Sequence, residues 1–367
     1  MDGTVSMQDR HKPVVAWLLA CCGLVFGMVV LGGFTRLTGS GLSMVDWRPI
    51  TGILPPMSTE QWQVVFEMYR QYPEYMKVNA GMSLDDFKGI FWLEYLHRVL
   101  GRLVGIAFFV PFVWFLIRGN ITAKESPKYI LMFLLGGAQG LLGWYMVKSG
   151  LVDRPNVSQY RLTAHLSMAF LIYGFMLWVA MSLAFPKQGD GRHPWFGRTV
   201  ALVGLLVVTI FSGGFVAGLK AGKIYNTFPK MGEHWVPPEI FAMQPGWLNV
   251  FENAVTAQFD HRLLALTTFV LIVVFWFTSR NAGFSRRANM ARLAFLHTAV
   301  LQVALGIAAL LLAVPIVIGA AHQAVGLLLL TTGIALTHGL RDATLAVAET
   351  SDDRQPAMRI GRLSVLD

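Results

Sequence analysis

Charged residues are scarce in this 367-residue chain, and their scarcity excludes a water-soluble domain. Only 14% of the residues are charged, against about one-quarter in an average soluble protein. In contrast, 54% are hydrophobic and the mean hydropathy is +0.53. The apolar residues form long blocks, which are typical of an integral membrane protein.

Cysteine is nearly absent, which excludes a disulfide framework. The two cysteines, Cys21 and Cys22, are adjacent and lie in the first apolar block. A vicinal pair cannot form a long-range disulfide without strain, and the sequence has no CxxC or CxxCH motif for a metal or a c-type haem. Both thiols are expected to be small packing residues.

Eight apolar runs are long enough to cross a bilayer as helices. They lie near 14–35, 91–117, 129–147, 162–185, 199–217, 259–278, 293–313 and 318–338. The first run has no small-residue cleavage site, so it is expected to remain as a helix and not to be removed as a signal peptide. The sequence therefore predicts an all-α integral membrane protein with eight transmembrane helices.

Basic residues set the expected orientation. The net charge of +9 would suggest a nucleic-acid partner in a soluble protein. Sorted by loop, 16 Lys and Arg fall on the side of both termini and 11 on the other, 5 of these in the long segment 36–90. The positive-inside rule then places both termini in the cytoplasm. Nucleic-acid binding is excluded, and a bacterial inner membrane is the expected location.

The two halves of the chain share short motifs in the same order. Residues 94–98 (EYLHR) correspond to 258–262 (QFDHR), 32–34 (GGF) to 213–215 (GGF), and 161–165 (RLTAH) to 318–322 (IGAAH). Four spans return the chain to its starting side. The repeat therefore predicts two four-helix bundles, 1–185 and 186–367, related by a pseudo-twofold axis along the membrane normal.

Long outer segments are expected to cover the bundles as lids. Within 36–90, the stretch 58–61 (STEQ) is a capping box. The apolar positions after it predict a short amphipathic helix at the membrane interface: Trp62, Val65, Phe66 and Tyr69. Ser83 with Asp86 predicts that the second long helix starts before the membrane. The segment between the fifth and sixth helices is similarly long and rich in Trp, Pro and Met.

Four of the nine histidines lie at matching positions, in the first turns of the even-numbered helices and near the outer face. They are His97, His165, His261 and His322. The other five lie in tails or loops, or toward the cytoplasmic ends of helices. A single intramembrane histidine is usually a satisfied polar contact, but two per bundle at one depth indicate ligation.

The donor set favours haem over other metal groups. A zinc site takes three or four protein ligands close together, and copper or di-iron sites need more thiolate or carboxylate. Two imidazoles from facing helices instead suit the two axial positions of a haem iron. One pair per bundle predicts two haem sites.

One acidic residue distinguishes the two halves. Glu94 lies three residues before His97, on the same helical face, whereas Gln258 holds the matching position before His261. A carboxyl group near the hydrocarbon is costly and is a functional candidate. The first site is therefore predicted to do chemistry, and the second to transfer electrons or to be structural. The alternative is that Glu94 only pairs with Arg98.

Three arginines inside the helices are candidates for haem contacts. They are Arg98, Arg102 and Arg262. Guanidinium groups are expected to bind haem propionates through charge-assisted hydrogen bonds. The alternative is that these side chains extend toward the interface from the helix ends.

The sequence resembles the haem A synthase family, in the form found in mitochondria and proteobacteria. The resemblance rests on 32–44 (GGFTRLTGSGLSM), on Trp47-Arg48-Pro49 with Gly52 and Pro55-Pro56, and on 94–102 (EYLHRVLGR). It extends over about 14–340. Some bacterial members carry a cysteine pair in the first outer loop. This chain has none there, so thiol-linked electron delivery is not expected.

The resemblance implies a reaction and a division of roles. Members of the family oxidise the C8 methyl group of haem O to the formyl group of haem A, by successive hydroxylations, for terminal oxidase assembly. His97 and His165 would then hold the substrate haem O. His261 and His322 would hold a haem b cofactor, and Glu94 would be the catalytic carboxylate. A haem O synthase is the implied partner, while the electron acceptor and the oligomeric state are left open.

Two other functions fit part of the pattern. A non-enzymatic dihaem cytochrome b, passing electrons between a quinol and a partner, explains four histidines. It does not explain an acid in one half only, nor long lids over both sites. A haem exporter or chaperone would need a labile site and no redox cofactor.

Overall fold

The computed structural model describes residues 7–46, 54–152, 155–187 and 189–342. Within these ranges, eight helices are long and apolar enough to cross a membrane, which confirms the predicted all-α membrane protein. They are α1 (Met7–Leu37), α4 (Leu84–Ile117), α5 (Ser126–Lys148), α6 (Gln159–Ala184), α7 (Phe196–Gly218), α9 (Ala254–Thr278), α10 (Arg286–Leu311) and α11 (Ile316–Gly339).

Each predicted span corresponds to one of these helices. The largest differences, of seven residues, are at the starts of α1 (Met7 against 14), α10 (Arg286 against 293) and α4 (Leu84 against 91). The difference at α4 has a local cause. This helix begins at Leu84 rather than near residue 91 because Ser83 caps it. The Ser83 hydroxyl accepts a hydrogen bond from the Asp86 N–H at 3.1 Å, and the Asp86 carboxylate accepts one from the Ser83 N–H at 3.3 Å. The predicted capping box is confirmed, and it extends α4 beyond the apolar run.

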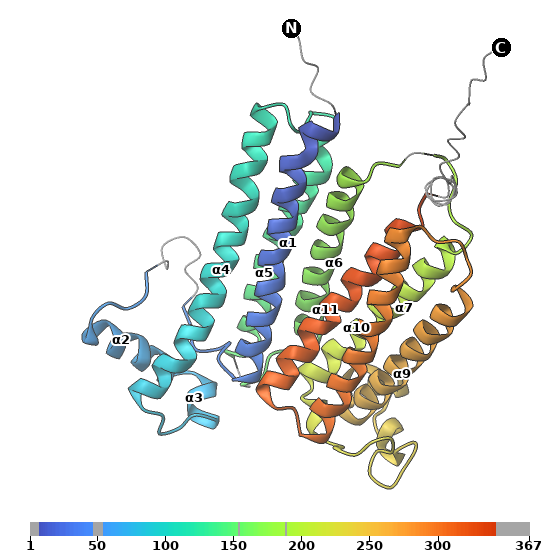
Figure 1. The fold of residues 1–367 in the computed structure, drawn as a ribbon. Helices are drawn as coiled ribbons and strands as arrows, with labels where there is room; N and C mark the ends of the chain where they lie inside the picture. The colour runs from blue at the N-terminus through green and yellow to red at the C-terminus, as the bar shows by residue number, and fades with distance from the viewer. Residues whose placement is uncertain (1–6, 47–53, 153–154, 188, 343–367) are drawn as a thin grey trace, which may run out of the picture.

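The eight helices form two groups of four (Figure 1). In the first group, α1 packs against α4 and α6, and α5 contacts both of these. In the second group, α7 packs against α9 and α11, and α10 contacts both. The groups meet where α1 contacts α11 and where α6 contacts α7 and α11. The pseudo-twofold axis and the division of the chain at residues 185 and 186 stay predictions.

Close backbone approach joins the two groups. A Cβ atom on Gly218, at the end of α7, would lie 2.6 Å from the Cα atom of Gln159, at the start of α6. On the other side of the junction, the Gln323 side chain donates a hydrogen bond to the Val29 carbonyl at 2.7 Å. The side chain of Gln323 also lies against Gly33. Glycine therefore allows the two groups to pack backbone to backbone.

The largest buried cluster lies among the eight long helices. Leu18 of α1, Ile272 of α9 and Leu327 of α11 are all fully buried in it. Cys21 and Cys22 belong to the same cluster as free thiols, with 1% and 5% of their surface exposed. The prediction that they are packing residues is confirmed.

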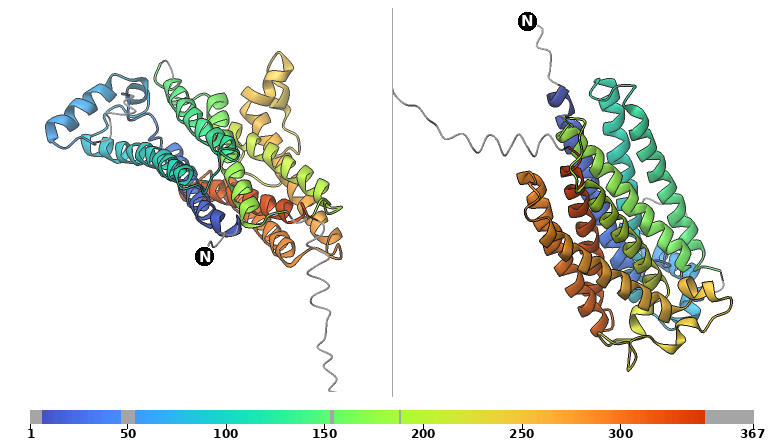
Figure 2. Two further views of the ribbon diagram at one scale, coloured as in Figure 1. Left: turned by 90° about the horizontal axis from the view of Figure 1, so that it is seen from above. Right: turned by 90° about the vertical axis from the view of Figure 1, so that its right-hand side faces the viewer.

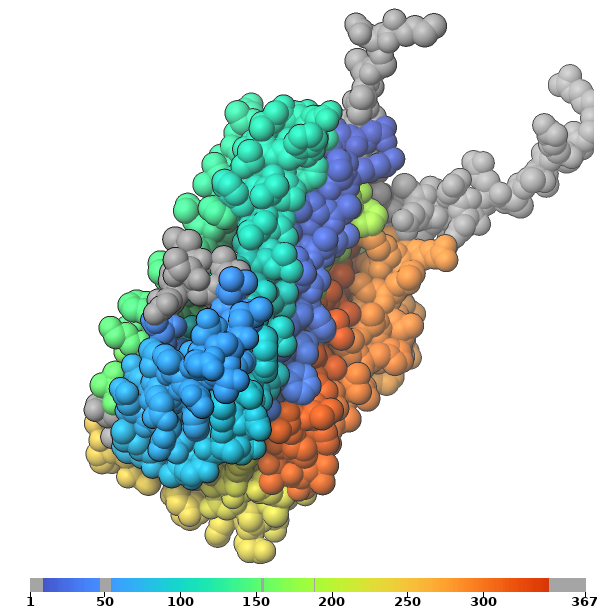
Figure 3. Space-filling model, turned by 90° about the vertical axis from the view of Figure 1, so that its left-hand side faces the viewer, coloured from blue at the N-terminus to red at the C-terminus, as the bar shows by residue number. Residues whose placement is uncertain are grey.

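A lid of two short helices, α2 (Thr59–Arg70) and α3 (Pro73–Lys77), lies beside the first part of α4. It protrudes from one side of the molecule in Figure 1, and in Figure 3 it faces the viewer as the light-blue segment. Ser58 caps α2 as predicted, by accepting a hydrogen bond from the Gln61 N–H at 3.3 Å. The apolar side of α2 packs on α4, where Trp62 and Phe91 have ring centroids 4.9 Å apart. The lid is thus attached to the extension of α4.

The long helices run between two faces of the molecule (Figures 1 and 2). The terminal face carries the start of α1 and the end of α11. The loop face carries the lid and the segment 219–253, which contains the short helices η1 (Ala221–Lys223), η2 (Pro238–Phe241), η3 (Gly246–Leu248) and α8 (Asn249–Glu252).

We expect the terminal face to be cytoplasmic. Alkaline phosphatase fused to the C-terminus should be inactive, because it needs disulfides that do not form in the cytoplasm, and a fluorescent protein fused there should fluoresce. The control is phosphatase inserted at Gly232 of the loop face, which should be active. Phosphatase activity from the C-terminal fusion would reverse the predicted orientation.

Candidate functional site

The four matching histidines lie on four helices, in the half of the molecule near the loop face. His165, His261 and His322 lie in the second turns of α6, α9 and α11. His97 lies further along α4 because α4 begins earlier. All four histidine residues are half-buried within the structure.

The structure brings these histidines together in pairs. The imidazoles of His97 and His165 lie within electrostatic range of each other, and so do those of His261 and His322. Each pair belongs to one group of four helices, which is the pairing that the repeat predicts. Ligation of iron by the four rings stays a prediction.

Every one of the four rings lies against a glycine of the neighbouring helix. A Cβ atom at these glycines would lie within about 3 Å of the ring: 3.1 Å for Gly32 and His97 Nε2, 2.9 Å for Gly143 and His165 Cε1, 3.0 Å for Gly213 and His261 Cε1, and 2.9 Å for Gly306 and His322 Cε1. Real Cβ atoms rarely approach so closely, so a larger residue would displace the imidazole. The glycines define where each ring can lie.

Unpaired polar atoms gather around the same rings, among the described residues. They are His165 Nδ1, Gln139 Oε1, His322 Nδ1, Gln302 Oε1 and Gln258 Oε1. Buried polar atoms normally have partners, so these sites are incomplete as protein alone. They indicate that further groups belong there.

The residues present fit haem better than a metal bound by protein alone. Among the described residues, no three His, Cys, Asp or Glu side chains cluster closely enough to hold a metal ion. Each site therefore offers two protein ligands, and a porphyrin would supply the other four. The glycine contacts fix the imidazoles of each pair on facing helices, as two axial ligands would require.

Glu94 is buried and accepts four hydrogen bonds. Its Oε2 atom accepts from the Ser43 hydroxyl at 2.7 Å and from the Met44 N–H at 2.8 Å. Its Oε1 atom accepts from Arg98 Nε at 3.1 Å and from Arg98 Nη2 at 2.6 Å. The pair with Arg98 considered as an alternative is therefore present. Four donors suit a carboxylate anion, which can only accept.

Gln258 makes the opposite contact in the second half. Its amide donates a hydrogen bond to the Tyr225 carbonyl at 3.1 Å. Tyr225 corresponds to Met44 of the first half, whose N–H donates to Glu94. The loop after α1 thus presents an N–H group, and the loop after α7 presents a carbonyl group. The acid and the amide each match the polarity of the loop that they contact.

Arg98 and Arg262 both bind backbone carbonyls of these loops. Arg98 donates to the Met44 carbonyl at 2.7 Å, and Arg262 donates to the Tyr225 carbonyl at 2.7 Å. Arg102 lies one turn further into α4 and is half-buried. The structure thus gives Arg98 and Arg262 a role in holding loops, and their contact with propionates stays a prediction. The motif 47–49 and Gly52 lie outside the described residues.

A second buried carboxylate, Glu74 of the lid, lies near the first site. It has 6% of its surface exposed and accepts a hydrogen bond from the Tyr69 hydroxyl at 3.1 Å. Burial raises the pKa of Glu74 to about 7; the Tyr69 hydrogen bond opposes this rise, the nearby charge of Glu94 adds to it, and Lys220 opposes it. Glu74 therefore titrates near neutrality.

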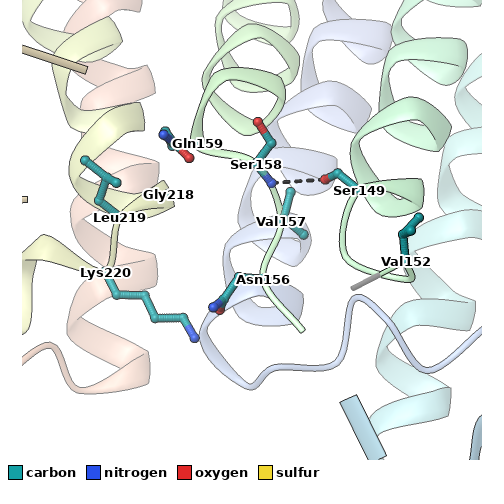
Figure 4. Close-up of a pocket in the computed structure, with 9 residues that line it drawn as sticks. All are labelled: Ser149, Val152, Asn156, Val157, Ser158, Gln159, Gly218, Leu219 and Lys220. Carbon is teal, nitrogen blue, oxygen red and sulfur yellow. Dashed lines mark hydrogen bonds between the residues drawn. The ribbon is translucent and has the colours of Figure 1, made fainter. Parts of the chain in front are cut away.

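A pocket of about 590 Å³ lies at the loop face where α5, α6 and α7 meet (Figure 4). It is lined by Ser149, Val152, Asn156, Val157, Ser158, Gln159, Gly218, Leu219 and Lys220. The Ser158 N–H donates to the Ser149 hydroxyl across it at 3.0 Å. None of the four histidines lines this pocket, so it is distinct from the imidazole sites.

Several residues of the sites were not predicted from the sequence. Ser43 and Glu74 lie in the loop and lid, where no periodic pattern identifies a contact. Ser212, whose hydroxyl lies 2.9 Å from His261 Nδ1, could have been found from the repeat. It precedes the GGF motif of the second half, where the first half has Leu31.

We expect Gly213→Val to remove haem from the second site. Its side chain would collide with the His261 ring, because even a Cβ atom would lie 3.0 Å from Cε1. The haem content of the purified variant should fall to about half that of the wild type if two sites are filled. Gly204→Val on the same helix is the control, since no atom lies within 4 Å of its Cβ position. Unchanged haem content in Gly213→Val would contradict the assignment.

We expect Glu74 to make stability depend on pH. Its pKa is about 7 in the folded protein against an ordinary 4.5, so the folded state retains a proton that the unfolded chain loses. The free energy of unfolding should fall as the pH rises from about 4.5 to 7, and then level off.

Thermal melts of detergent-solubilised protein at about pH 5 and pH 8 would measure this fall. Glu74→Gln should reduce it, whereas Glu67→Gln, at an exposed ion pair with Arg70, should not. An equal fall in wild type and Glu74→Gln would show that another group is responsible.

Comparison with known proteins shows the family of this chain. The family model described as cytochrome oxidase assembly protein matches residues 15–334. The chain is 51% identical over 335 residues to "Heme A synthase" of Nitrosospira multiformis, covering 90% of this chain and 94% of that protein. It is 44% identical over 354 residues to "Heme A synthase COX15" of Homo sapiens, covering 92% and 86%. The chain therefore belongs to the cytochrome oxidase assembly protein family COX15-CtaA.

Proposed function

We propose that this protein is a haem A synthase that oxidises the C8 methyl group of haem O to the formyl group of haem A. The observation that carries the proposal is that two matching histidine sites differ in one acidic residue, Glu94 against Gln258. Two relatives named "Heme A synthase", which are 51% and 50% identical to this chain, support the proposal. The reaction class is an oxidation at a methyl carbon.

The two sites take different haems in this proposal. His97 and His165 bind the iron of the substrate haem O, and His261 and His322 bind haem b as a resident cofactor. Bound haem b supplies a one-electron redox centre. The protein itself orients the substrate through the imidazole pair, and the glycine contacts fix the imidazole rings.

Glu94 acts through its charge. It lies on the same face of α4 as His97, and both of its oxygen atoms accept hydrogen bonds. Such a fixed carboxylate stabilises positive charge that develops at the methyl carbon during oxidation. Proton transfer suits it less, because Arg98 and Ser43 already occupy its acceptor positions.

Burial strengthens this electrostatic effect. Glu94 has 3% of its surface exposed, and Phe91, one turn earlier on α4, is packed under the lid. A charge that is shielded from water acts more strongly on a nearby reacting group. The lid thus contributes to the reaction by excluding solvent from the start of α4.

The competing function, a dihaem cytochrome b, would use both sites in the same way. It gives no reason for a buried acid in one site and a neutral amide in the other. In the proposed setting, the protein lies in a bacterial inner membrane with both sites toward the periplasm. A haem O synthase supplies its substrate.

We expect Glu94→Gln to bind haem normally and to form haem A at least about 100-fold more slowly, which is the usual effect of removing one electrostatic stabiliser. The measurement is extraction and chromatography of haem after co-expression with a haem O synthase. Glu67→Gln is the control, because its carboxylate is exposed. Normal haem A yield from Glu94→Gln would refute the role of Glu94. Two haems b and no haem A in the wild type would refute the synthase.

A further inference from the structure

Among the four matching histidines, His261 is the one whose Nδ1 atom lies within hydrogen-bond distance of a side-chain hydroxyl in the described part of the chain. The Ser212 hydroxyl lies 2.9 Å from this nitrogen, and the same hydroxyl donates its hydrogen to the Thr209 carbonyl at 2.7 Å. Since a hydroxyl has only one hydrogen, Ser212 Oγ accepts from Nδ1–H of His261. The ring is therefore held with its proton on Nδ1, which leaves the Nε2 lone pair free for iron.

The corresponding position in the first half has no such group. The GGF motifs align Gly32 with Gly213, so Leu31 stands where Ser212 stands in the second half. Leucine has no hydrogen-bonding atom in its side chain. His97 therefore has no side-chain hydrogen-bond acceptor at this position of α1.

A second polar contact joins the same two helices one turn deeper. The Thr209 and Thr268 hydroxyls lie 2.8 Å apart, between α7 and α9. The matching positions of the first half are Met28 and Val104, which are both apolar. The helix pair that carries His261 is thus joined by a hydroxyl pair close to the ring, whereas the hydrogen bond that joins α1 and α4, from Trp17 Nε1 to the Ala107 carbonyl at 2.8 Å, lies further along these helices.

We infer that Ser212 is a positioning residue, which fixes the His261 ring for permanent binding of one haem and sets the electron donation of its axial ligand. The inference rests on the proposed function, in which the second haem stays and the first is exchanged. A hydrogen bond from Nδ1–H increases the basicity of the imidazole and favours oxidised iron. The lack of this bond at His97 suits a site that must release its product.

The test is Ser212→Ala in the full-length, haem-loaded protein. We expect haem b to bind about 10–100-fold more weakly, as measured by haem retention during dilution and gel filtration. We also expect its midpoint potential to rise in a spectroelectrochemical titration, because the ligand becomes less basic. Ser212→Thr, which keeps the hydroxyl, should restore both values.

Leu31→Ala is the matched control at the corresponding position of the first half, and it should leave the potential of haem b unchanged. Unchanged haem b affinity and potential in Ser212→Ala would overturn the inference, even if the wild type forms haem A. If the wild type forms no haem A but binds haem b at His261, the proposed function fails. The potential shift in Ser212→Ala would then still support the role of Ser212.

Discussion

The close contact between imidazole and glycine is the constraint on which the sites depend. A histidine on one long helix can turn toward a neighbouring helix only where that neighbour has no side chain, and this occurs four times, at Gly32, Gly143, Gly213 and Gly306. Each contact fixes the position of a ring without a covalent link. The depth of the histidines and the spacing of the helices are therefore set by the same small residues.

The two halves use one scaffold with opposite polarity at the loop face. Arg98 and Arg262 hold their loops by donating to carbonyl groups in both halves. The residue four positions before each arginine differs with the loop that it contacts. Glu94 accepts from the Met44 N–H, and Gln258 donates to the Tyr225 carbonyl. An acid at 258 would face the Tyr225 carbonyl, whereas an amide at 94 could still accept from Met44 through its oxygen atom but would lose the charge that pairs with Arg98. The difference between the sites thus extends into the loops and is not confined to two side chains.

The sequence predicts the eight spans, the caps at Ser58 and Ser83, and the positions of the four histidines, because these depend on apolar runs and local spacing. It does not predict the contacts of Arg98 with the loop after α1, or those of Glu74. Those contacts depend on which backbone groups an irregular loop presents, and on where the lid meets α4. Hydrophobic periodicity carries no information on either. The role of Ser212 could be predicted from the sequence only by comparing the two halves, because Leu31 stands at the matching position.

The continuity of α4 couples the lid to the first site mechanically. No break interrupts this helix between Leu84, beside the lid, and Glu94 and His97. Ten residues of helix span about 15 Å. Because the lid packs on this segment through Phe87 and Phe91, the same helix that anchors the lid also carries the acid and the imidazole of the first site.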